Sequence, residues 1–459
     1  MKKFTFLLSA FLIITTSISI GQRRGDVSYA LLANQAATPN FFFESIVIPH
    51  ENEEQAQLVF IFRMDNSFIP FKKISGDENL KAPEDAEFYS IARLNTEIFK
   101  GGSSQKELKN TATISRDLWQ DTLYTKSYDE TKSKKMFASG RLVTELDPGM
   151  YNYVLQLSLM EETNERNSQR RNVKIENFKT KKTGEIYLIN SGAITSSLEV
   201  INLGDNVLYG KDFQALIRIP NYNPSQEYSL VVNKAKVNNK DTSNVEIVKT
   251  LPINASQIVT NAKLSLLQSE NTALEVKQGE GSFTYALIEV PNSEFENSVY
   301  NLELKSNSDK KPLAHKVVRS FWPDIPPSLL NLDISIEMMK YIVSEDQLKN
   351  LKKGSAKEKE NKFRAFWEKR DPTPDTEYNE LMTEYYNRIH YAFVEYRSPE
   401  TPNGQDTDRG EVYIKYGPPN SRDRSFPKKG KVIETWTYDN RTFVFEKGSG
   451  FSEFMLVGK

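Results

Sequence analysis

Between residues 22 and 180, apolar positions fall in short runs separated by polar or Pro/Gly-containing segments. The clearest run alternates, so that Tyr151, Tyr153, Leu155, Leu157 and Leu159 share one face of an extended segment. On this basis strands are predicted at residues 42–48, 57–62, 87–94, 141–145 and 151–159. Strands with no helical period between them predict a β-sandwich, with a curved sheet of another topology as the alternative.

Two polar segments interrupt these runs. Residues 117–135 are charged and lack periodicity, so we expect an exposed excursion there. Residues 164–172 are polar and slightly basic, which is typical of a connector.

A second block of the same character covers residues 182–319. Strands are predicted at residues 185–188, 198–202, 213–219, 228–232, 245–248, 284–290 and 300–304. Residues 299–304 (Val-Tyr-Asn-Leu-Glu-Leu) parallel residues 150–155 (Met-Tyr-Asn-Tyr-Val-Leu), which suggests two similar sandwiches in tandem. Both resemble the immunoglobulin-like modules of bacterial exported proteins, a likeness of fold that implies no function.

After a proline-rich joint at residues 321–327, the apolar spacing becomes helical. A helix is predicted at residues 334–341, and the capping-box spacing of Ser344 and Gln347 predicts a second one from Glu345. The highly charged segment 352–362 is interpreted as a solvated face, broken at Gly354. A further helix carries Phe363 and the aromatic residues that follow it.

Pro372 and Pro374 end that helix near Arg370, because neither can donate a backbone N–H. Thr373 before Pro374 predicts the start of the next helix, which runs to Tyr396. Its predicted apolar face consists of Tyr378, Leu381, Met382, Tyr385, Ile389, Ala392, Phe393 and Tyr396. A strand is then predicted at residues 411–416, followed by a meander at 432–438, 442–446 and 451–457, which makes the last domain an α+β unit of helices and about four strands.

Several motifs in this last domain resemble the bacterial GWxTD domain. They are Phe-Trp-x-x-Arg-Asp-Pro-Thr-Pro-x-Thr-x-x-Asn-Glu (366–380), Glu-Tyr-Tyr-x-Arg (384–388), Thr-Asp-Arg-Gly-x-Val-Tyr-Ile-x-Tyr-Gly-Pro-Pro (407–419) and, upstream, Phe-Trp-Pro-Asp-Ile-Pro (321–326) and Tyr-Ile-Val (341–343). The resemblance implies a domain from Phe321 to the C-terminus, and it implies no biochemical activity. One position departs from the pattern, because Gln405 stands where the family name calls for Trp.

The N-terminus is typical of a secretory signal peptide. Lys2 and Lys3 precede an apolar run from Phe4 to Ile20, and small residues lie before a cleavage site predicted after Gly21. An uncleaved anchor is the alternative, although the run is marginal for a span of about 20 residues. The predicted organisation is therefore a signal peptide (1–21), two sandwiches (22–180 and 181–320) and the GWxTD-like domain (321–459), exported to the periplasm or beyond, with no transmembrane segment after cleavage.

Composition excludes several kinds of function. The 459 residues include 60 Lys+Arg against 61 Asp+Glu, so no general positive field attracts nucleic acid. Cysteine is absent, which excludes disulfides and thiolate metal sites. His50, His315 and His390 are the only histidines and fall in three different predicted domains, so neither a zinc site nor a Ser-His-Asp triad is expected. No cofactor is predicted.

The candidate chemistry is a polar set in the last domain: Arg370, Asp371, Asn379, Glu380, Arg388, Asp408 and Arg409. One interpretation is structural, with turn-fastening residues and interior ion pairs. The other is a cleft in which Asp371 and Asp408 perform acid/base chemistry. The first predicts a non-enzymatic exported protein that binds another envelope protein or polymer. The alternative is an extracytoplasmic hydrolase or transferase, whose carboxylates should lie roughly 5 to 10 Å apart beside a pocket.

Overall fold

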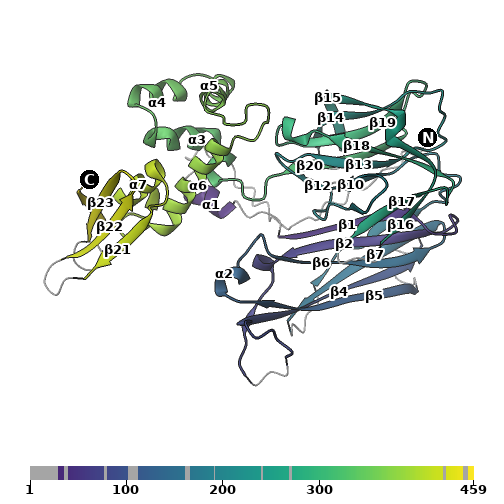
Figure 1. The fold of residues 1–459 in the computed structure, drawn as a ribbon, viewed down its shortest axis with the longest axis horizontal. Coiled ribbons are helices and arrows are strands. Elements are labelled where there is room, and N and C mark those ends of the chain that lie inside the picture. Colours follow the sequence, from purple (N-terminus) through teal and green to yellow (C-terminus); the bar gives the residue numbers. More distant parts are fainter. Residues whose placement is uncertain are drawn as a thin grey trace. The chain divides into compact units, whose positions relative to one another are not determined.

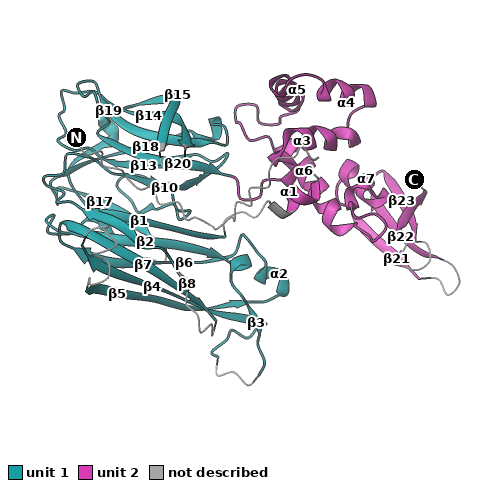
Figure 2. Ribbon diagram, turned by 180° about the vertical axis from the view of Figure 1, so that it is seen from behind, with its two compact units in different colours: residues 1–13, 39–321 teal, residues 14–38, 322–459 magenta. Residues whose placement is uncertain are grey.

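The structure is a computed structural model that describes residues 29–35, 40–76, 80–101, 112–160, 166–190, 192–238, 241–267, 271–426, 431–447 and 453–458. It divides into two compact units (Figures 1 and 2). Unit 1 contains residues 39–321, and unit 2 contains residues 322–459 together with helix α1 (Tyr29–Gln35). In the described ranges, no helix has the length and apolar character that crossing a membrane requires. The predicted signal peptide and its cleavage site lie outside the described residues.

Unit 1 begins with two antiparallel sheets (Figure 1). The first has the order β1-β2-β6, formed by β1 (Phe41–Pro49), β2 (Ala56–Asp65) and β6 (Phe137–Leu146). The second has the order β3-β4-β7-β8, with β5 paired to β4 and β9 paired to β7. Its strands are β3 (Lys72–Lys73), β4 (Phe88–Lys100), β5 (Thr113–Thr125), β7 (Gly149–Leu159), β8 (Arg166–Asn167) and β9 (Arg171–Ile175), and the short α2 (Tyr128–Thr131) follows β5.

Two further sheets complete unit 1, in the orders β10-β13-β18-β16-β17-β11 and β12-β20-β19-β14-β15. The strands are β10 (Ile186–Ile189), β11 (Leu198–Glu199), β12 (Asn206–Leu208), β13 (Phe213–Arg218), β14 (Tyr228–Asn238), β15 (Asp241–Ile253), β16 (Ile258–Leu266), β17 (Ala273–Gln278), β18 (Phe283–Val290), β19 (Val299–Ser306) and β20 (Ala314–Phe321). All pairings are antiparallel except β12 with β20.

The central strand β2 is buried on both faces. Its apolar run includes Val59 and Ile61 on one face and Phe60 on the other, and all three are at most 1% exposed. A strand with such a continuous apolar run needs cover on both sides. One hydrophobic core accordingly joins β2 and β7 to residues of β13, β16 and β18, such as Leu216. This core therefore contains residues from both predicted sandwich regions, and the second region has a further core that includes Leu230 and Leu302.

The prediction of an exposed excursion at residues 117–135 is wrong for its first part. Strand β5 pairs with β4 over almost its whole length, from Phe88 opposite Thr125 to Phe99 opposite Thr113. Its residues alternate between half-buried and exposed, but the exposed positions include Ile114 and Leu118 as well as Arg116, and the half-buried positions include Asp117. Apolar and charged residues therefore lie on both faces of this edge strand, so the period that the prediction requires is absent.

Unit 2 consists of helices followed by an antiparallel sheet of order β21-β22-β23-β24 (Figure 1). The helices are α1, α3 (Leu332–Met338), α4 (Glu345–Lys352), α5 (Ala356–Glu368), α6 (Glu380–Glu395) and α7 (Asp408–Tyr416), with the 3-10 helix η4 (Pro327–Leu330) before α3. The strands are β21 (Ser421–Ser425), β22 (Val432–Tyr438), β23 (Arg441–Lys447) and β24 (Phe454–Gly458). The predicted fold class, two all-β sandwiches followed by an α+β domain, is confirmed.

Local signals at α4 and α5 are confirmed. The Ser344 hydroxyl accepts from the Gln347 amide, and the Gln347 side chain accepts from the Ser344 amide, which is the predicted capping box. Gly354 separates α4 from α5 with a φ of +111°, a conformation that side chains disfavour. The helix that carries Phe363 ends at Glu368, close to the predicted end near Arg370.

The predicted start of the next helix at Thr373-Pro374 is wrong. Helix α6 begins at Glu380, and Asn379 caps it by accepting from the Met382 amide at 2.8 Å. Thr373 instead belongs to a turn in which its carbonyl accepts from the Thr376 amide. The side chain of Asn379 is nearly fully buried, so tertiary packing favours the later cap.

The strand predicted at residues 411–416 is also wrong, because these residues form helix α7. Thr407 caps this helix, and Gly417 ends it with a φ of +80°. Val412, Tyr413 and Ile414 are consecutive and all buried, because α7 contacts both α6 and β24. A helix covered on two sides loses the one-sided period that would distinguish it from a strand. The final sheet still has four described strands, but β21 takes the place of the predicted one.

Candidate functional site

The family motif, residues 404–408, forms the bend that leads into α7. Gly404 approaches α6 so closely that a Cβ there would lie 2.3 Å from the carbonyl oxygen of Ala392. The Thr407 hydroxyl donates to the Gly404 carbonyl oxygen at 2.7 Å and accepts from the Gly410 amide at 3.0 Å. Asp408 Oδ2 accepts from the backbone amide of Leu456 at 2.6 Å. The glycine, threonine and aspartate of the motif thus hold α7 against α6 and β24.

Gln405 occupies the motif position of tryptophan, and its side chain is 1% exposed. Its Oε1 is buried without a hydrogen-bond partner among the described residues. Its carbonyl oxygen accepts from the Tyr341 hydroxyl at 2.9 Å, which ties the bend to the segment after α3. A side chain at position 405 therefore faces the interior, where it contributes to packing.

Arg370, Asp371 and Asn379 of the predicted polar set lie at the junction of α5 and α6. Arg370 donates to the Phe366 carbonyl oxygen at 2.7 Å, and its guanidinium lies 3.7 Å from the Phe366 ring centroid. Asp371 Oδ1 accepts from the Thr373 amide at 2.9 Å. Asn379 Nδ2 donates to the Trp367 carbonyl oxygen at 3.0 Å. These contacts fasten the turn between the helices.

The remaining members of the predicted set lie on other elements. Glu380, at the start of α6, accepts from the Thr373 hydroxyl at 2.6 Å. Arg388 donates to Glu384 at 2.8 Å one turn earlier on α6. Asp408 and Arg409 lie at the start of α7. No hydrogen bond or ion pair between described residues joins Asp371 to Asp408, and each of these carboxylates accepts from a backbone amide.

Sequence reasoning missed the charged centre of the sheet, which is Glu434 on β22. This carboxylate is 3% exposed. It accepts from Arg424 Nε at 3.0 Å and from Trp436 Nε1 at 2.7 Å, and Arg409 lies 3.6 Å away. Burial acts to raise the pKa of Glu434, but the hydrogen bonds from Arg424 and Trp436 and the charge of Arg409 outweigh it, so the pKa is lowered. Glu434 is therefore ionised and neutralises one of two nearby guanidinium groups.

Arg422, on the edge strand β21, is exposed and lies beside a group of aromatic rings. Its guanidinium lies 4.8 Å from the Trp436 ring centroid and 5.8 Å from those of Tyr396 and Tyr413. The ring of Tyr391 stacks on Tyr413 at 4.5 Å, which extends the aromatic surface. Among the described residues, no carboxylate forms an ion pair with Arg422. We name Arg422, Tyr391, Tyr396, Tyr413 and Trp436 the arginine platform.

The register of β21 and β22 positions the platform. In the antiparallel register, Arg422 lies opposite Trp436 and Arg424 lies opposite Glu434. The two arginines are two residues apart, so their side chains extend from the same face of β21. The available sequence signal was the alternation in Ser-Arg-Asp-Arg-Ser at residues 421–425, which has the period of a strand.

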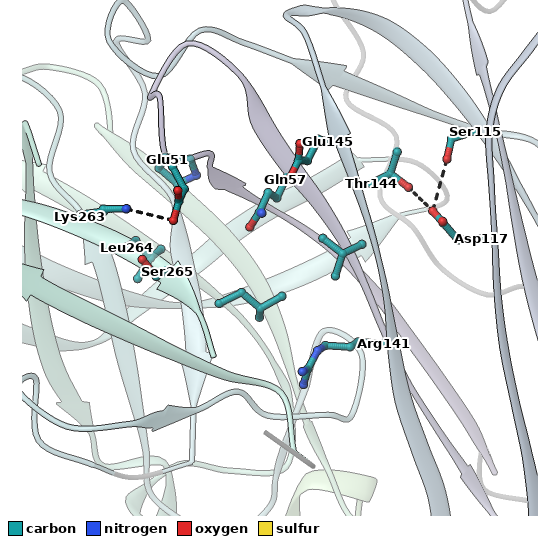
Figure 3. A pocket seen from close by; sticks show the side chains of 13 residues that line it. Glu51, Gln57, Ser115, Asp117, Arg141, Thr144, Glu145, Lys263, Leu264 and Ser265 are labelled. Atoms are coloured by element: carbon teal, nitrogen blue, oxygen red, sulfur yellow. Dashed lines mark hydrogen bonds and ion pairs between the residues drawn. The ribbon is translucent and has the colours of Figure 1, made fainter. Parts of the chain in front are cut away.

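A polar cleft of about 610 Å³ lies in unit 1, between β6 and β16 (Figure 3). Its walls carry Glu51, Asp117, Arg141, Glu145 and Lys263. Lys263 lies 3.3 Å from Glu51, while Asp117 accepts from the Thr144 hydroxyl at 2.5 Å. The described residues contain no group of His, Asp and Glu that could hold a metal ion. Lys263 and Glu51 form an ion pair within the cleft, whereas Arg141 donates to the Asn271 carbonyl oxygen and Glu145 lies 3.3 Å from His50.

Two solved structures are similar to this chain at low sequence identity. The C-terminal domain of the Streptococcus pyogenes antigen I/II-family protein AspA is 8% identical, with 61% of this chain and 100% of that chain covered and a TM-score of 0.16. The trypsin-activated alpha-2-macroglobulin from Escherichia coli is 10% identical, with a TM-score of 0.17, and the match covers 62% of this chain and 17% of that one. TM-scores this low support no argument. No curated protein matches the sequence.

The family comparison is informative. Residues 298–453 match the model of the GWxTD domain. The match begins at β19, upstream of the start predicted at Phe321, and extends to the last strand. It includes the bend at residues 404–408, in which the motif glycine, threonine and aspartate make the contacts described above. The C-terminal region of this chain is therefore a GWxTD domain.

Proposed function

We propose that this protein is exported and acts as a non-enzymatic binding protein, in which the GWxTD domain binds an acidic, extended segment of another envelope protein. The observation that carries the proposal is the arginine platform. Arg422 is exposed, supported by aromatic rings and not paired with a carboxylate of the described chain. A guanidinium held in this way can bind a carboxylate through two parallel hydrogen bonds.

The position of Arg422 favours a peptide as the ligand. β21 is an edge strand of the described sheet, and all five of its residues are exposed. The unpaired side of an edge strand offers backbone N–H and C=O groups to a further strand. Arg422 and Arg424 extend from one face of that edge, so an added strand with acidic side chains would complement their charge. Charged edge strands also discourage aggregation, which explains exposed arginines but not the aromatic support of Arg422.

The alternative function, hydrolysis or group transfer with Asp371 and Asp408, has no supporting observation. Asp371 accepts from the Thr373 amide in the turn before α6, and Asp408 accepts from the Leu456 amide on β24. No contact brings an acid and a base together at these positions among the described residues.

The binding test uses the chain from residue 22 to residue 459 and two labelled probes, polyglutamate and polygalacturonate, with anisotropy as the readout. We expect polyglutamate to bind, and Arg422→Gln to weaken its binding about tenfold because a charge-assisted hydrogen bond is lost. Binding should also weaken as salt is added. Arg370→Gln is the matched control, since Arg370 is an exposed arginine on an aromatic ring elsewhere in the domain.

Three outcomes would contradict the proposal: no binding of polyglutamate, equal loss in both variants, or an Arg422-dependent binding of polygalacturonate alone. The last would assign the platform to an acidic polysaccharide. Thermal unfolding of both variants shows whether the fold is intact.

Export has its own test. The N-terminal residues predict cleavage after Gly21, so the intact mass of protein isolated from the producing cell's envelope or medium should correspond to a chain that begins at Gln22. A mass that includes residues 1–21 would contradict cleavage and favour the uncleaved anchor.

A further inference from the structure

Helix α1 precedes β1 in the sequence but packs against the GWxTD domain, in unit 2 (Figure 2). The Tyr29 ring meets the Phe393 ring edge-on, with the centroids 4.9 Å apart. The Tyr29 hydroxyl lies 3.1 Å from His390 Nδ1. Helix α1 also contacts η4. We call His390, Phe393 and η4 the docking surface of α1.

Helix α1 is held by this surface and not by its own sequence. It has seven residues, and an isolated helix of that length is not stable in water. Tyr29 and Leu32 are three residues apart and about 5% exposed, whereas Leu31, on the outer side, is 47% exposed. One apolar face therefore provides the attachment.

The attachment is small relative to the core of the domain. Release of α1 exposes two large side chains, Tyr29 and Leu32, from their buried positions. The core behind them comprises residues of α3, α5, α6, α7 and the sheet, including the fully buried Trp436 and Tyr386. A segment with so few buried contacts opens at a lower free energy than the domain as a whole.

We propose that α1 is a detachable internal ligand of the GWxTD domain, and that its docking surface is a binding site for a short amphipathic helix. Helix α1 belongs to unit 2, whereas the next described strand, β1, belongs to unit 1. Release of α1 would free this N-terminal segment from unit 2. The proposal uses none of the residues of the arginine platform and does not depend on it.

The chain contains no cysteine, so single cysteines report on docking through their rate of modification by a thiol reagent. Leu31→Cys places a thiol on the outer side of α1, and Leu32→Cys places one on its docked side. Val412→Cys places one in the core, on α7, where Val412 is 5% exposed. We expect Leu31→Cys to react as a free thiol, Leu32→Cys about tenfold or more slowly, and Val412→Cys about a further hundredfold more slowly.

Equal modification rates for Leu31→Cys and Leu32→Cys would show that α1 is not docked. Equal rates for Leu32→Cys and Val412→Cys would show that α1 is released from the domain only when the whole domain unfolds. Either result overturns the proposal. Thermal unfolding of each variant identifies one that fails to fold, and Ala33→Cys then replaces Leu32→Cys, because Ala33 also packs against the core.

The docking surface is tested as a binding site with a synthetic peptide of residues 27–37. Excess peptide should compete with α1 and raise the modification rate of Leu32→Cys severalfold, while Val412→Cys stays unchanged. A peptide with Leu32→Asp is the control and should have no effect, because it places a charge on the buried face. An unchanged rate with the native peptide, or an equal effect of both peptides, would overturn the assignment of the surface as a helix-binding site.

Discussion

Gly404→Ala is expected to destabilise the GWxTD domain by about 3 kcal/mol, because an inserted methyl group forces a close-packed backbone apart. The new Cβ would lie 2.3 Å from the Ala392 carbonyl oxygen and 2.6 Å from the Arg397 amide nitrogen, and both are backbone atoms that cannot rotate away. Separating the bend from α6 also strains the Thr407 cap, since its hydroxyl donates to the Gly404 carbonyl. Urea unfolding followed by tryptophan fluorescence measures the loss.

The fluorescence signal reports mainly on unit 2, which contains Trp322, Trp367 and Trp436, whereas Trp119 lies in unit 1. Gly458→Ala is the matched control in the same unit. Its Cβ would meet Val444 at 3.5 Å, an ordinary contact, so we expect a change of less than about 0.5 kcal/mol. An unfolding midpoint of Gly404→Ala equal to that of the control would contradict a close-packed bend.

Glu434→Gln is expected to cost about 3 kcal/mol, because it removes the one carboxylate among the described residues that pairs with Arg409 and Arg424. Glutamine has nearly the same size, so packing around Trp436 is preserved and the effect isolates the charge. The Arg409 side chain is 16% exposed, so water compensates poorly for its lost partner. The difference in urea midpoint between the native chain and the variant gives the cost.

The same centre makes stability depend on pH. The pKa of Glu434 is lowered in the folded state, so its contribution is fully present above the ordinary carboxyl pKa of about 4.5 and is lost as the pH falls through the folded-state pKa. The difference in stability between the native chain and Glu434→Gln should therefore stay constant from pH 7 down to about pH 4.5 and narrow as the pH falls further. Glu446→Gln on β23 is the control, because its pair with Lys431 is half-exposed and contributes little. A gap that is constant with pH would contradict the role of the charge.

Local signals were sufficient for the general order of strand-rich and helical regions, but not for the class of every element, since α7 was predicted as a strand. The capping box at Ser344 and the turn at Gly354 depend on residues within a few positions of each other, and both were predicted correctly. Most strands of unit 1 were also predicted, because alternation along a strand such as β7 is visible without knowledge of its partners. The same rule failed for β5, which has apolar and charged residues on both faces, and for α7, which is buried on two sides.

The sequence by itself determined that strand-rich regions precede a region of helices followed by strands, which region carries the GWxTD motif, and that no cysteine chemistry occurs, since each depends on residue types or on neighbours in the chain. Only the tertiary structure decided the rest. The register of β21 and β22 places Arg422 beside Trp436, and Glu434 lies between two arginines. Asp371 and Asp408 both accept hydrogen bonds from backbone amides. Tyr29 packs beside His390, 361 residues away in the sequence. Contacts between distant segments depend on how all elements pack together, and a local sequence pattern does not predict that packing.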